Sequence, residues 1–235
     1  MPMMKAAPFE YNFDLDHIAL VCIDMQRDFC EVGGFASSLG NNVKLIAPCI
    51  PVIAELQAAF RQAGLPIIHT KECHKPDLSD CPTAKRERGN PKVKIGMEGT
   101  MGRILIDGQP GSGFIDQCMP MDGELVIPKP GKDAFYATPL NDYLHRRGIT
   151  NLIFTGATTE VCVQTSMRAA NDRGYDCLLV EDGTGSYFPK FKASVLEQVV
   201  AQDAIIGWTA PSEEIIQMLS KLRPLLHEVA TAPAR

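Results

Sequence analysis

The sequence predicts an α/β protein with a parallel sheet that is covered by helices on both faces. Apolar, β-rich runs alternate with helical patterns along most of the chain, as in proteins built from βαβ units. The first of these runs, residues 17–23, is continuously apolar, which is typical of a strand buried on both faces. Neither a repeat nor a low-complexity linker divides the 235 residues, so we expect a single domain over residues 1–235.

Each expected element has its own signal in the sequence. Pro51 and Gly64 bound the first helix, because proline suits a first helical turn and glycine a helix end. Thr138 and Gly148 bound the second helix in the same way. Pro128 favours an edge position for its strand, because proline cannot donate to the sheet ladder. In chain order the expected elements are strand 17–23, helix 51–64, strand 66–70, strand 125–129, helix 138–147, strand 151–155, helix 161–173, strand 176–180, helix 190–202, strand 204–207 and helix 211–222.

Residues 71–123 interrupt this alternation. They are rich in Pro, Gly, Lys and Asp and are only weakly periodic. A segment of this length within a compact domain is usually functional. We therefore expect residues 71–123 to form a lid over the site or part of an oligomer interface.

Composition and charge narrow the class of protein. Hydrophobic content of 45% and charged content of 22% are ordinary for a globular protein in water. The net charge of −5 gives no reason to expect nucleic acid or an anionic membrane surface as a partner. The first eight residues lack the apolar core of a signal peptide, and no apolar run approaches the roughly 20 residues of a membrane helix. We expect a soluble, cytoplasmic protein.

One of the eight cysteines stands out by its position. No two cysteines form a CxxC pair, so neither a disulfide framework nor a thiolate metal cluster is indicated. Cys162 lies where the apolar run 151–155 gives way to a helical pattern. A residue that opens a helix lies beside free backbone N–H groups and the positive end of the helix dipole, which stabilise a thiolate. Cys162 is therefore the candidate nucleophile, and we expect its thiol to lose the proton easily.

Two charged residues lie at the ends of other expected strands. Asp24 follows the first strand and Lys129 ends the third. Taken alone, Asp24 equally fits a turn or helix-capping aspartate, and Lys129 equally fits a solvated surface lysine. Lys132, on the same loop, is the competing candidate for the lysine. Because ligands collect at the carboxyl ends of parallel strands, Asp24, Lys129 and Cys162 are expected at one edge of the sheet. There a carboxylate can take the thiol proton and return it to a leaving amine, while an ammonium stabilises the thiolate.

Three motifs carry a resemblance to a known family. They are Ile-Asp-Met-Gln-x-x-Phe at residues 23–29, the strand-end Lys-Pro at 129–130 followed by Phe135 and Thr-Pro-Leu at 138–140, and Gly-x-x-Thr-x-x-Cys-Val at 156–163. In this order, and over almost the whole chain, the sequence resembles the isochorismatase-like cysteine hydrolases. The resemblance implies a Rossmann-like three-layer α/β/α sandwich with a mostly parallel central sheet.

The same resemblance implies roles for individual residues. It makes Asp24 the proton shuttle, Lys129 the electrostatic support and Cys162 the nucleophile. The oxyanion hole of the family carries over to the backbone N–H groups of Thr158 and Cys162, with a non-proline cis peptide bond between Ala157 and Thr158. The implied reaction is hydrolysis of a small amide through a covalent, thioester-type intermediate.

Within the family, residues 70–80 and 171–175 resemble the biuret hydrolase and triuret hydrolase branch. Gln202 falls where that branch uses a glutamine to bind amide or carbonyl groups of the substrate; an exposed helix-end glutamine is the alternative. Phe29 is expected to wall the pocket or, alternatively, to pack in the core. Glu160 stands where an aspartate is common, and it either changes the polarity of the pocket or is a longer surface acid. The expected partners are a small ureide, biuret or triuret, and water.

No metal ion or other cofactor is expected. Zinc nicotinamidases share the triad and add an Asp/His metal site. Here Glu72 and His74 are the only nearby candidates, whereas a first-row metal needs about three or more protein ligands. His69 is expected to be a structural histidine at a strand end.

Several alternatives stay open. A related amidase of the same family would act on ureidoacrylate, N-carbamoylsarcosine or nicotinamide. A non-catalytic, redox-responsive thiol protein is the alternative from another class. A nucleotide-binding oxidoreductase is disfavoured because no G-x-G-x-x-G follows the first strand. The family resemblance also implies a homo-oligomer, often a tetramer.

Overall fold

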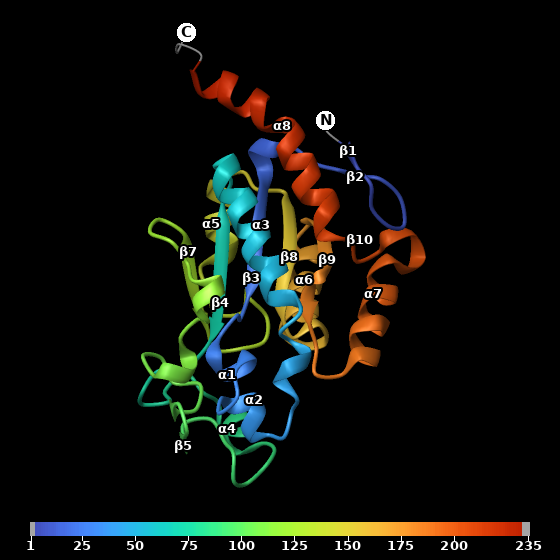
Figure 1. The fold of residues 1–235 in the computed structure, drawn as a ribbon. Helices are drawn as coiled ribbons and strands as arrows, with labels where there is room; N and C mark the ends of the chain where they lie inside the picture. Colours follow the sequence, from blue (N-terminus) through green and yellow to red (C-terminus); the bar gives the residue numbers. More distant parts are fainter. Residues whose placement is uncertain (1–2, 232–235) are drawn as a thin grey trace.

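The computed structural model describes residues 3–231, with side chains described as far as residue 222. Its centre is a six-stranded sheet in the order β10-β9-β8-β3-β4-β7, in which every pair of neighbours is parallel (Figure 1). The strands of this sheet are β3 (Ile18–Ile23), β4 (Ile67–Glu72), β7 (Leu125–Lys129), β8 (Asn151–Ala157), β9 (Asp176–Gly185) and β10 (Trp208–Ala210). The predicted α/β class with a parallel central sheet is confirmed.

Helices flank the sheet, and short elements gather at its ends. The long helices are α3 (Cys49–Ala63), α5 (Leu140–Arg146), α6 (Gln164–Asn171), α7 (Pro189–Ala204) and α8 (Ser212–Thr231). The short ones are α1 (Arg27–Cys30), α2 (Phe35–Ser38) and α4 (Thr83–Glu87), the 3-10 turns η1 (Leu15–His17), η2 (Val43–Leu45), η3 (Pro110–Ser112) and η4 (Asp116–Cys118), and the π-helical turn η5 (Thr159–Val163). Two antiparallel pairs complete the described chain: β1 (Met3–Met4) with β2 (Tyr11–Asn12), and β5 (Glu98–Gly99) with β6 (Gly102–Arg103).

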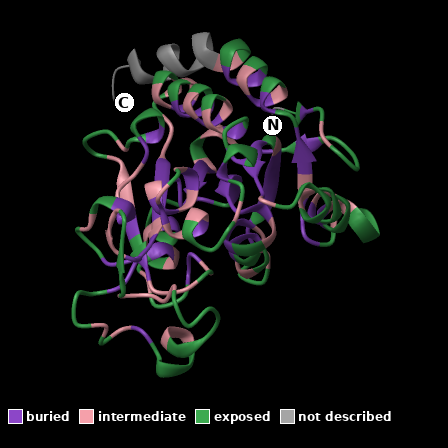
Figure 2. Cartoon of the chain, turned by 60° about the horizontal axis from the view of Figure 1, so that its bottom comes forward, coloured by how far each residue is buried: buried purple, intermediate pink, exposed green. Residues whose placement is uncertain are grey.

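Every residue of β3 is buried, so apolar core lies against both faces of the sheet. Side chains of β3 alternate between two apolar clusters, one that includes Leu20 and Cys22 and one that includes Val21 and Ile23. Residues of α3 and α8 complete the first cluster, and residues of α5, α6 and α7 complete the second. Figure 2 shows buried residues concentrated in the central strands and exposed ones on the outer surfaces of the helices. Helices on both faces thus make the three layers.

The strand order creates one position suited to a site. β4 and β7 continue the sheet from one side of β3, whereas β8, β9 and β10 continue it from the other. In open parallel sheets, ligands bind in the crevice at the carboxyl ends of the strands where the order reverses. That position lies between the ends of β3 and β8, the strands that precede Asp24 and Cys162.

One expected strand is wrong. Residues 204–207 do not pair in the sheet; α7 continues to Ala204, and β10 begins only at Trp208. Gln202, Asp203 and Ala204 have positive φ angles of 52°, 56° and 62°. The chain therefore turns in a left-handed conformation before the strand starts, so the apolar run from residue 204 includes the turn. The expected helix 161–173 is also divided, because a π-helical turn precedes α6.

Much of the segment of residues 71–123 lies at the carboxyl edge of the sheet, whereas its last residues run along α3 to the start of β7. It carries α4 and β5, which lie near α1 and α2 at one end of the molecule (Figure 1). The buried carboxylate of Asp28 ties it to this end, because it accepts the N–H of Phe35 at 3.0 Å and of Leu105 at 3.2 Å. A lid or interface role for the segment stays a prediction. None of the helices among the described residues is long and apolar enough to cross a membrane.

Gly156 yields a test of how closely β8 must approach β3. Its φ is 116°, and a Cβ atom there would lie 2.1 Å from the carbonyl oxygen of Ile23. We expect Gly156→Ala to lower the free energy of unfolding by about 3 kcal/mol or more, because it adds a backbone clash to an unfavourable φ. Gly174→Ala is the matched control: its φ is 86° but no atom lies within 4 Å, so about 1 kcal/mol is expected. Equal losses in urea unfolding would contradict this interpretation.

Candidate active site

Asp24 directly follows β3 and is held by the neighbouring strand. Its side chain is fully buried, and its φ of 49° lies in the left-handed region. The hydroxyl of Thr70 in β4 donates a hydrogen bond to Asp24 Oδ1 at 2.6 Å, and the Asp24 N–H donates to the Thr70 carbonyl oxygen at 3.1 Å. Asp24 is therefore fixed in both backbone and carboxylate before any substrate binds.

Lys129 ends β7 and lies fully buried beside Asp24. Its Nζ is 2.7 Å from Asp24 Oδ2, and it also donates to the carbonyl oxygens of Gly131 at 2.9 Å and Lys132 at 3.2 Å. Burial lowers the pKa of Lys129, but Asp24 and the other acidic groups beside it outweigh burial and raise that pKa above its ordinary value. Lys129 is thus a charged ammonium that lies between one carboxylate and two carbonyl oxygens.

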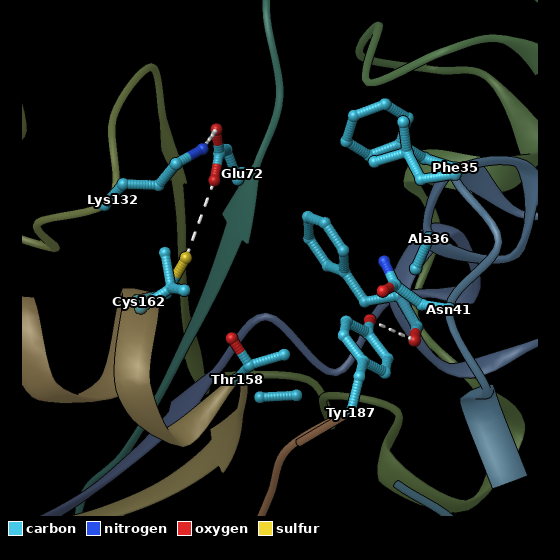
Figure 3. Close-up of a pocket in the computed structure, with 12 residues that line it drawn as sticks. Phe35, Ala36, Asn41, Glu72, Lys132, Thr158, Cys162 and Tyr187 are labelled. Atoms are coloured by element: carbon cyan, nitrogen blue, oxygen red, sulfur yellow. Dashed lines mark hydrogen bonds and ion pairs between the residues drawn. The ribbon is translucent and has the colours of Figure 1, made fainter. Parts of the chain in front are cut away.

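Cys162 lies in η5, immediately before α6, and its sulfur points toward the carboxylate of Glu72 (Figure 3). The sulfur and one carboxylate oxygen each of Asp24 and Glu72 all lie within 4.8 Å of one another. The thiol donates a hydrogen bond to Glu72 Oε2 at 3.5 Å. The structure therefore brings together the ends of β3, β4 and β7 and the turn after β8, four segments that are far apart in the sequence.

The thiol of Cys162 does not ionise as easily as its position at a helix start suggested. Burial raises its pKa well above the usual cysteine value, and Asp24 and Glu72 raise it further. Lys129 and, more weakly, Lys132 oppose this rise in the pKa. Removal from water and two nearby carboxylates thus outweigh the cations and the helix start. In the resting structure Cys162 is a neutral thiol that needs a proton acceptor.

Glu72, which the sequence indicated only as a candidate metal ligand, is a further charged group in the site. It ends β4, and the parallel register places it opposite Lys129 of β7. Its Oε1 accepts hydrogen bonds from Lys132 Nζ at 2.6 Å and Lys85 Nζ at 2.8 Å. Burial raises the pKa of Glu72, but Lys132, Lys129 and Lys85 together lower it to about 2. Its place two residues after the expected strand 66–70 was the available signal in the sequence.

The pair of Glu72 and His74 already binds a cation that the chain itself supplies. The ammonium of Lys85 lies 2.8 Å from Glu72 Oε1 and 3.0 Å from His74 Nε2, and it also donates to the carbonyl oxygen of Pro130. Burial and the charge of Lys85 lower the pKa of His74, so its Nε2 is free to accept. A metal ion at this pair would have to displace a bound ammonium.

Asp24, Glu72 and Cys162 form the one cluster of His, Cys, Asp and Glu side chains, among the described residues, that is compact enough to share an ion. The Nζ atom of Lys129 lies 2.7 Å from Asp24 Oδ2, and that of Lys132 lies 2.6 Å from Glu72 Oε1. These ammonium groups neutralise the two carboxylates and would repel a divalent cation. The donor set therefore fits a metal ion poorly.

A cavity of about 270 Å³ opens at the sulfur of Cys162 (Figure 3). Phe29, Phe35 and Tyr187 form much of its apolar wall, and the Tyr187 hydroxyl donates to the carbonyl oxygen of Phe29 at 2.7 Å. Thr158 lines the cavity next to the sulfur, after a cis peptide bond from Ala157. The structure thus places Phe29 and Thr158 at the pocket.

Gln202 and Glu160 do not line this cavity. Gln202 is exposed near the end of α7, and α7 starts at the carboxyl edge of the sheet and runs back to the opposite edge (Figure 1). The direction of this helix carries Gln202 away from Cys162, so within one chain the structure does not support a substrate contact for Gln202. Glu160 is half-buried in η5, and its Oε2 has no hydrogen-bond partner among the described residues.

These observations define the class of protein: an α/β protein with a buried cysteine, aspartate and lysine at the carboxyl edge of a parallel sheet, where the cysteine sulfur meets a cavity. A family model for the isochorismatase domain matches residues 18–211. The chain therefore belongs to the isochorismatase domain family.

Solved structures of similar proteins agree with this assignment. An isochorismatase family protein from Desulfovibrio vulgaris subsp. vulgaris str. Hildenborough is 27% identical, with a TM-score of 0.73, over 86% of this chain and 98% of that one. A cysteine hydrolase from Pseudomonas syringae pv. phaseolicola 1448A has a TM-score of 0.76 at 21% identity, over 94% and 98% of the two chains. N-carbamoylsarcosine amidase from Thermoplasma acidophilum has a TM-score of 0.62 at 24% identity, over 84% and 98%. The last two likenesses concern the fold.

The lowered pKa of Glu72 predicts a dependence of stability on pH. Because its pKa falls from about 4.5 to about 2 on folding, the contribution of Glu72 is fully present above pH 4.5 and is lost as the pH falls through 2. The difference corresponds to about 3 kcal/mol. We expect the stability gap between the wild type and Glu72→Gln to shrink by about 2 kcal/mol between pH 6 and pH 3 in urea unfolding. A gap independent of pH would show that Glu72 is not held ionised by its lysines.

Proposed function

We propose that this protein is a cysteine amidohydrolase that cleaves a terminal C–N bond of a small carbamoyl-urea, biuret or triuret, and releases ammonia. The meeting of Asp24, Lys129 and Cys162 at the carboxyl edge of the sheet, with the sulfur of Cys162 at a cavity, carries this proposal. The three groups complement one another: a thiol needs a proton acceptor, and a buried carboxylate needs a cation to stay ionised. The proposed unit is a single domain without a cofactor, acting in the cytoplasm as a homo-oligomer.

The first half of the proposed reaction forms the thioester. Asp24 takes the proton of Cys162, and Lys129 stabilises the resulting thiolate. The sulfur then attacks the terminal carbonyl carbon, and the oxygen that becomes negative lies against the backbone N–H groups of Thr158 and Cys162. A donor of this kind contributes roughly 3 kcal/mol to catalysis in comparable sites.

The second half returns the proton and releases the products. Asp24 protonates the departing nitrogen, the C–N bond breaks, and ammonia leaves. Asp24 next takes a proton from water, which attacks the thioester carbonyl and frees Cys162. Thr70 at 2.6 Å and Lys129 at 2.7 Å hold the Asp24 carboxylate in one position, with an oxygen within 4.8 Å of the sulfur.

A small, flat and polar substrate suits the cavity. The space is about 270 Å³, and polar side chains interrupt its apolar wall at only a few places, among them Glu72, Lys132 and Asn41. Biuret and triuret offer in-plane N–H donors and carbonyl acceptors to such groups. A site built to bond these groups rejects analogues that lack them more strongly than an apolar pocket does.

An N-carbamoyl amino acid, such as N-carbamoylsarcosine, is the second candidate substrate. The Lys132 side chain lines the cavity and is 45% exposed, so its ammonium is available to a substrate carboxylate. Ureidoacrylate would use the same contact, whereas nicotinamide has no negative charge to offer.

Ammonia release tests the proposed activity and the nucleophile together. We expect the wild type to release ammonia from biuret or triuret faster than from N-carbamoylsarcosine or nicotinamide. Cys162→Ala should lower this rate by at least about 1000-fold while the circular dichroism spectrum stays unchanged, because no other group can form the thioester. Cys81→Ala is the matched control, since Cys81 is buried but does not line the cavity, and it should keep the activity.

Two results would contradict the proposal. Ammonia release by Cys162→Ala at the wild-type rate would exclude Cys162 as the nucleophile. A wild type that is inert to every amide, with rapid oxidation of Cys162, would instead favour a redox-responsive thiol protein.

Lys129, at the end of β7, and Lys132, in the loop that follows, are expected to differ in their effect on catalysis. Lys129→Met leaves the fully buried Asp24 without its cation, so we expect kcat/KM to fall by at least about 1000-fold. Lys132→Met leaves Glu72 its bond to Lys85, and a loss of about tenfold is expected. Steady-state kinetics on the same amide compare the two variants. The reverse order would mean that Lys132 is the catalytic cation.

A further inference from the structure

The carboxylate of Glu72 has two oxygens in different situations. Oε1 accepts hydrogen bonds from the ammonium groups of Lys132 at 2.6 Å and Lys85 at 2.8 Å. Oε2 accepts from the thiol of Cys162 at 3.5 Å. Glu72 is only 1% exposed and lines the cavity beside the sulfur. Neither half of the proposed reaction uses this second carboxylate.

We propose that Glu72 Oε2 accepts a hydrogen bond from the N–H of the carbamoyl group under attack, and that this bond makes the enzyme select amides over esters. The inference rests on the proposed function and names a further substrate-binding residue for it. When Cys162 gives its proton to Asp24, the donor of the Oε2 bond disappears. An acceptor at the reacting centre is then free for the substrate.

The arrangement around the sulfur suits this contact. In Figure 3, Glu72 and Thr158 lie on opposite sides of the sulfur of Cys162. The oxygen and nitrogen of a carbamoyl group point away from each other in one plane. If the oxygen lies against the N–H of Thr158, the nitrogen is directed toward Glu72. One substrate orientation therefore satisfies both contacts.

The charge of Glu72 makes the contact selective. Its three lysine neighbours hold it ionised, so both oxygens can accept hydrogen bonds and neither can donate one. An ester oxygen in place of the amide nitrogen would face this carboxylate with lone pairs and leave it unpaired. As the S–C bond forms and the C–N bond breaks, the nitrogen keeps its two hydrogens and gains the thiol proton through Asp24. Glu72 is next to the nitrogen while this proton arrives.

A role for Glu72 as the base for the thiol is the competing explanation. A carboxylate with a pKa of about 2 is a weak proton acceptor, and the charge of Glu72 raises the pKa of Cys162. Loss of this charge should therefore make the thiol easier to ionise. Loss of a base would do the opposite, so the two roles predict shifts in opposite directions.

The first experiment compares an amide with its ester counterpart. Ammonia release from biuret and methanol release from methyl allophanate are measured for the wild type and Glu72→Gln. We expect kcat/KM for biuret to fall about 100-fold, because a side-chain N–H replaces the acceptor, and the value for the ester to fall less than about fivefold. Equal losses on both substrates would overturn the inference.

The second experiment measures the rate of Cys162 alkylation by iodoacetamide against pH. For Glu72→Gln we expect the midpoint of this profile at lower pH than in the wild type; a midpoint at higher pH would overturn the inference and make Glu72 the base. Glu72→Asp keeps the charge, but its shorter side chain moves the carboxylate oxygens away from the sulfur. This variant tests the inference if Glu72→Gln does not fold. It should lose biuret turnover selectively and keep the wild-type profile. If the wild type itself turns over no amide, the proposed function fails together with this inference; turnover with equal losses on amide and ester removes the inference alone.

Discussion

A fully buried ion pair between Lys129 and Asp24 is the interaction on which the rest of the site depends. Two charges removed from water are stable only when good geometry and further hydrogen bonds compensate for their lost hydration. Here Thr70 bonds the carboxylate, and two backbone carbonyls bond the ammonium. The ion pair crosses the end of β4, which lies between β3 and β7 in the sheet. It therefore joins the ends of three strands close to the thiol of Cys162.

The same pair explains how a neutral thiol can be a nucleophile. Burial and two carboxylates keep the proton on Cys162 at rest, while Lys129 favours its release. This balance limits the reactivity of the Cys162 sulfur before a substrate binds, because a buried thiolate is unfavourable in free energy. Glu72 extends the pattern, since three lysines hold it ionised in the wall of the same cavity. Carboxylates and ammonium groups thus surround one uncharged sulfur in the site.

Several features were predictable because they depend on local pattern. The buried strands follow from continuous apolar runs, and the edge position of β7 follows from Pro128. Asp24, Lys129 and Cys162 were predictable as a group because the carboxyl ends of parallel strands share one edge. Gln202 lies away from Cys162 within one chain for a geometric reason: a helix that leaves the carboxyl edge ends at the opposite edge. The strand expected at 204–207 failed because a left-handed turn occupies part of its apolar run.

The sequence by itself determined the alternation of strands and helices, the apolar core on both faces and the residue types available for chemistry. These depend on side-chain character at each position and on spacing along the chain. Only the tertiary structure decided which charges pair: Lys129 with Asp24, and Lys132 and Lys85 with Glu72. It also decided that the pKa of the Cys162 thiol is raised rather than lowered. Both outcomes depend on distances and burial between remote segments, and electrostatic energies change too steeply with these to be read from order along the chain.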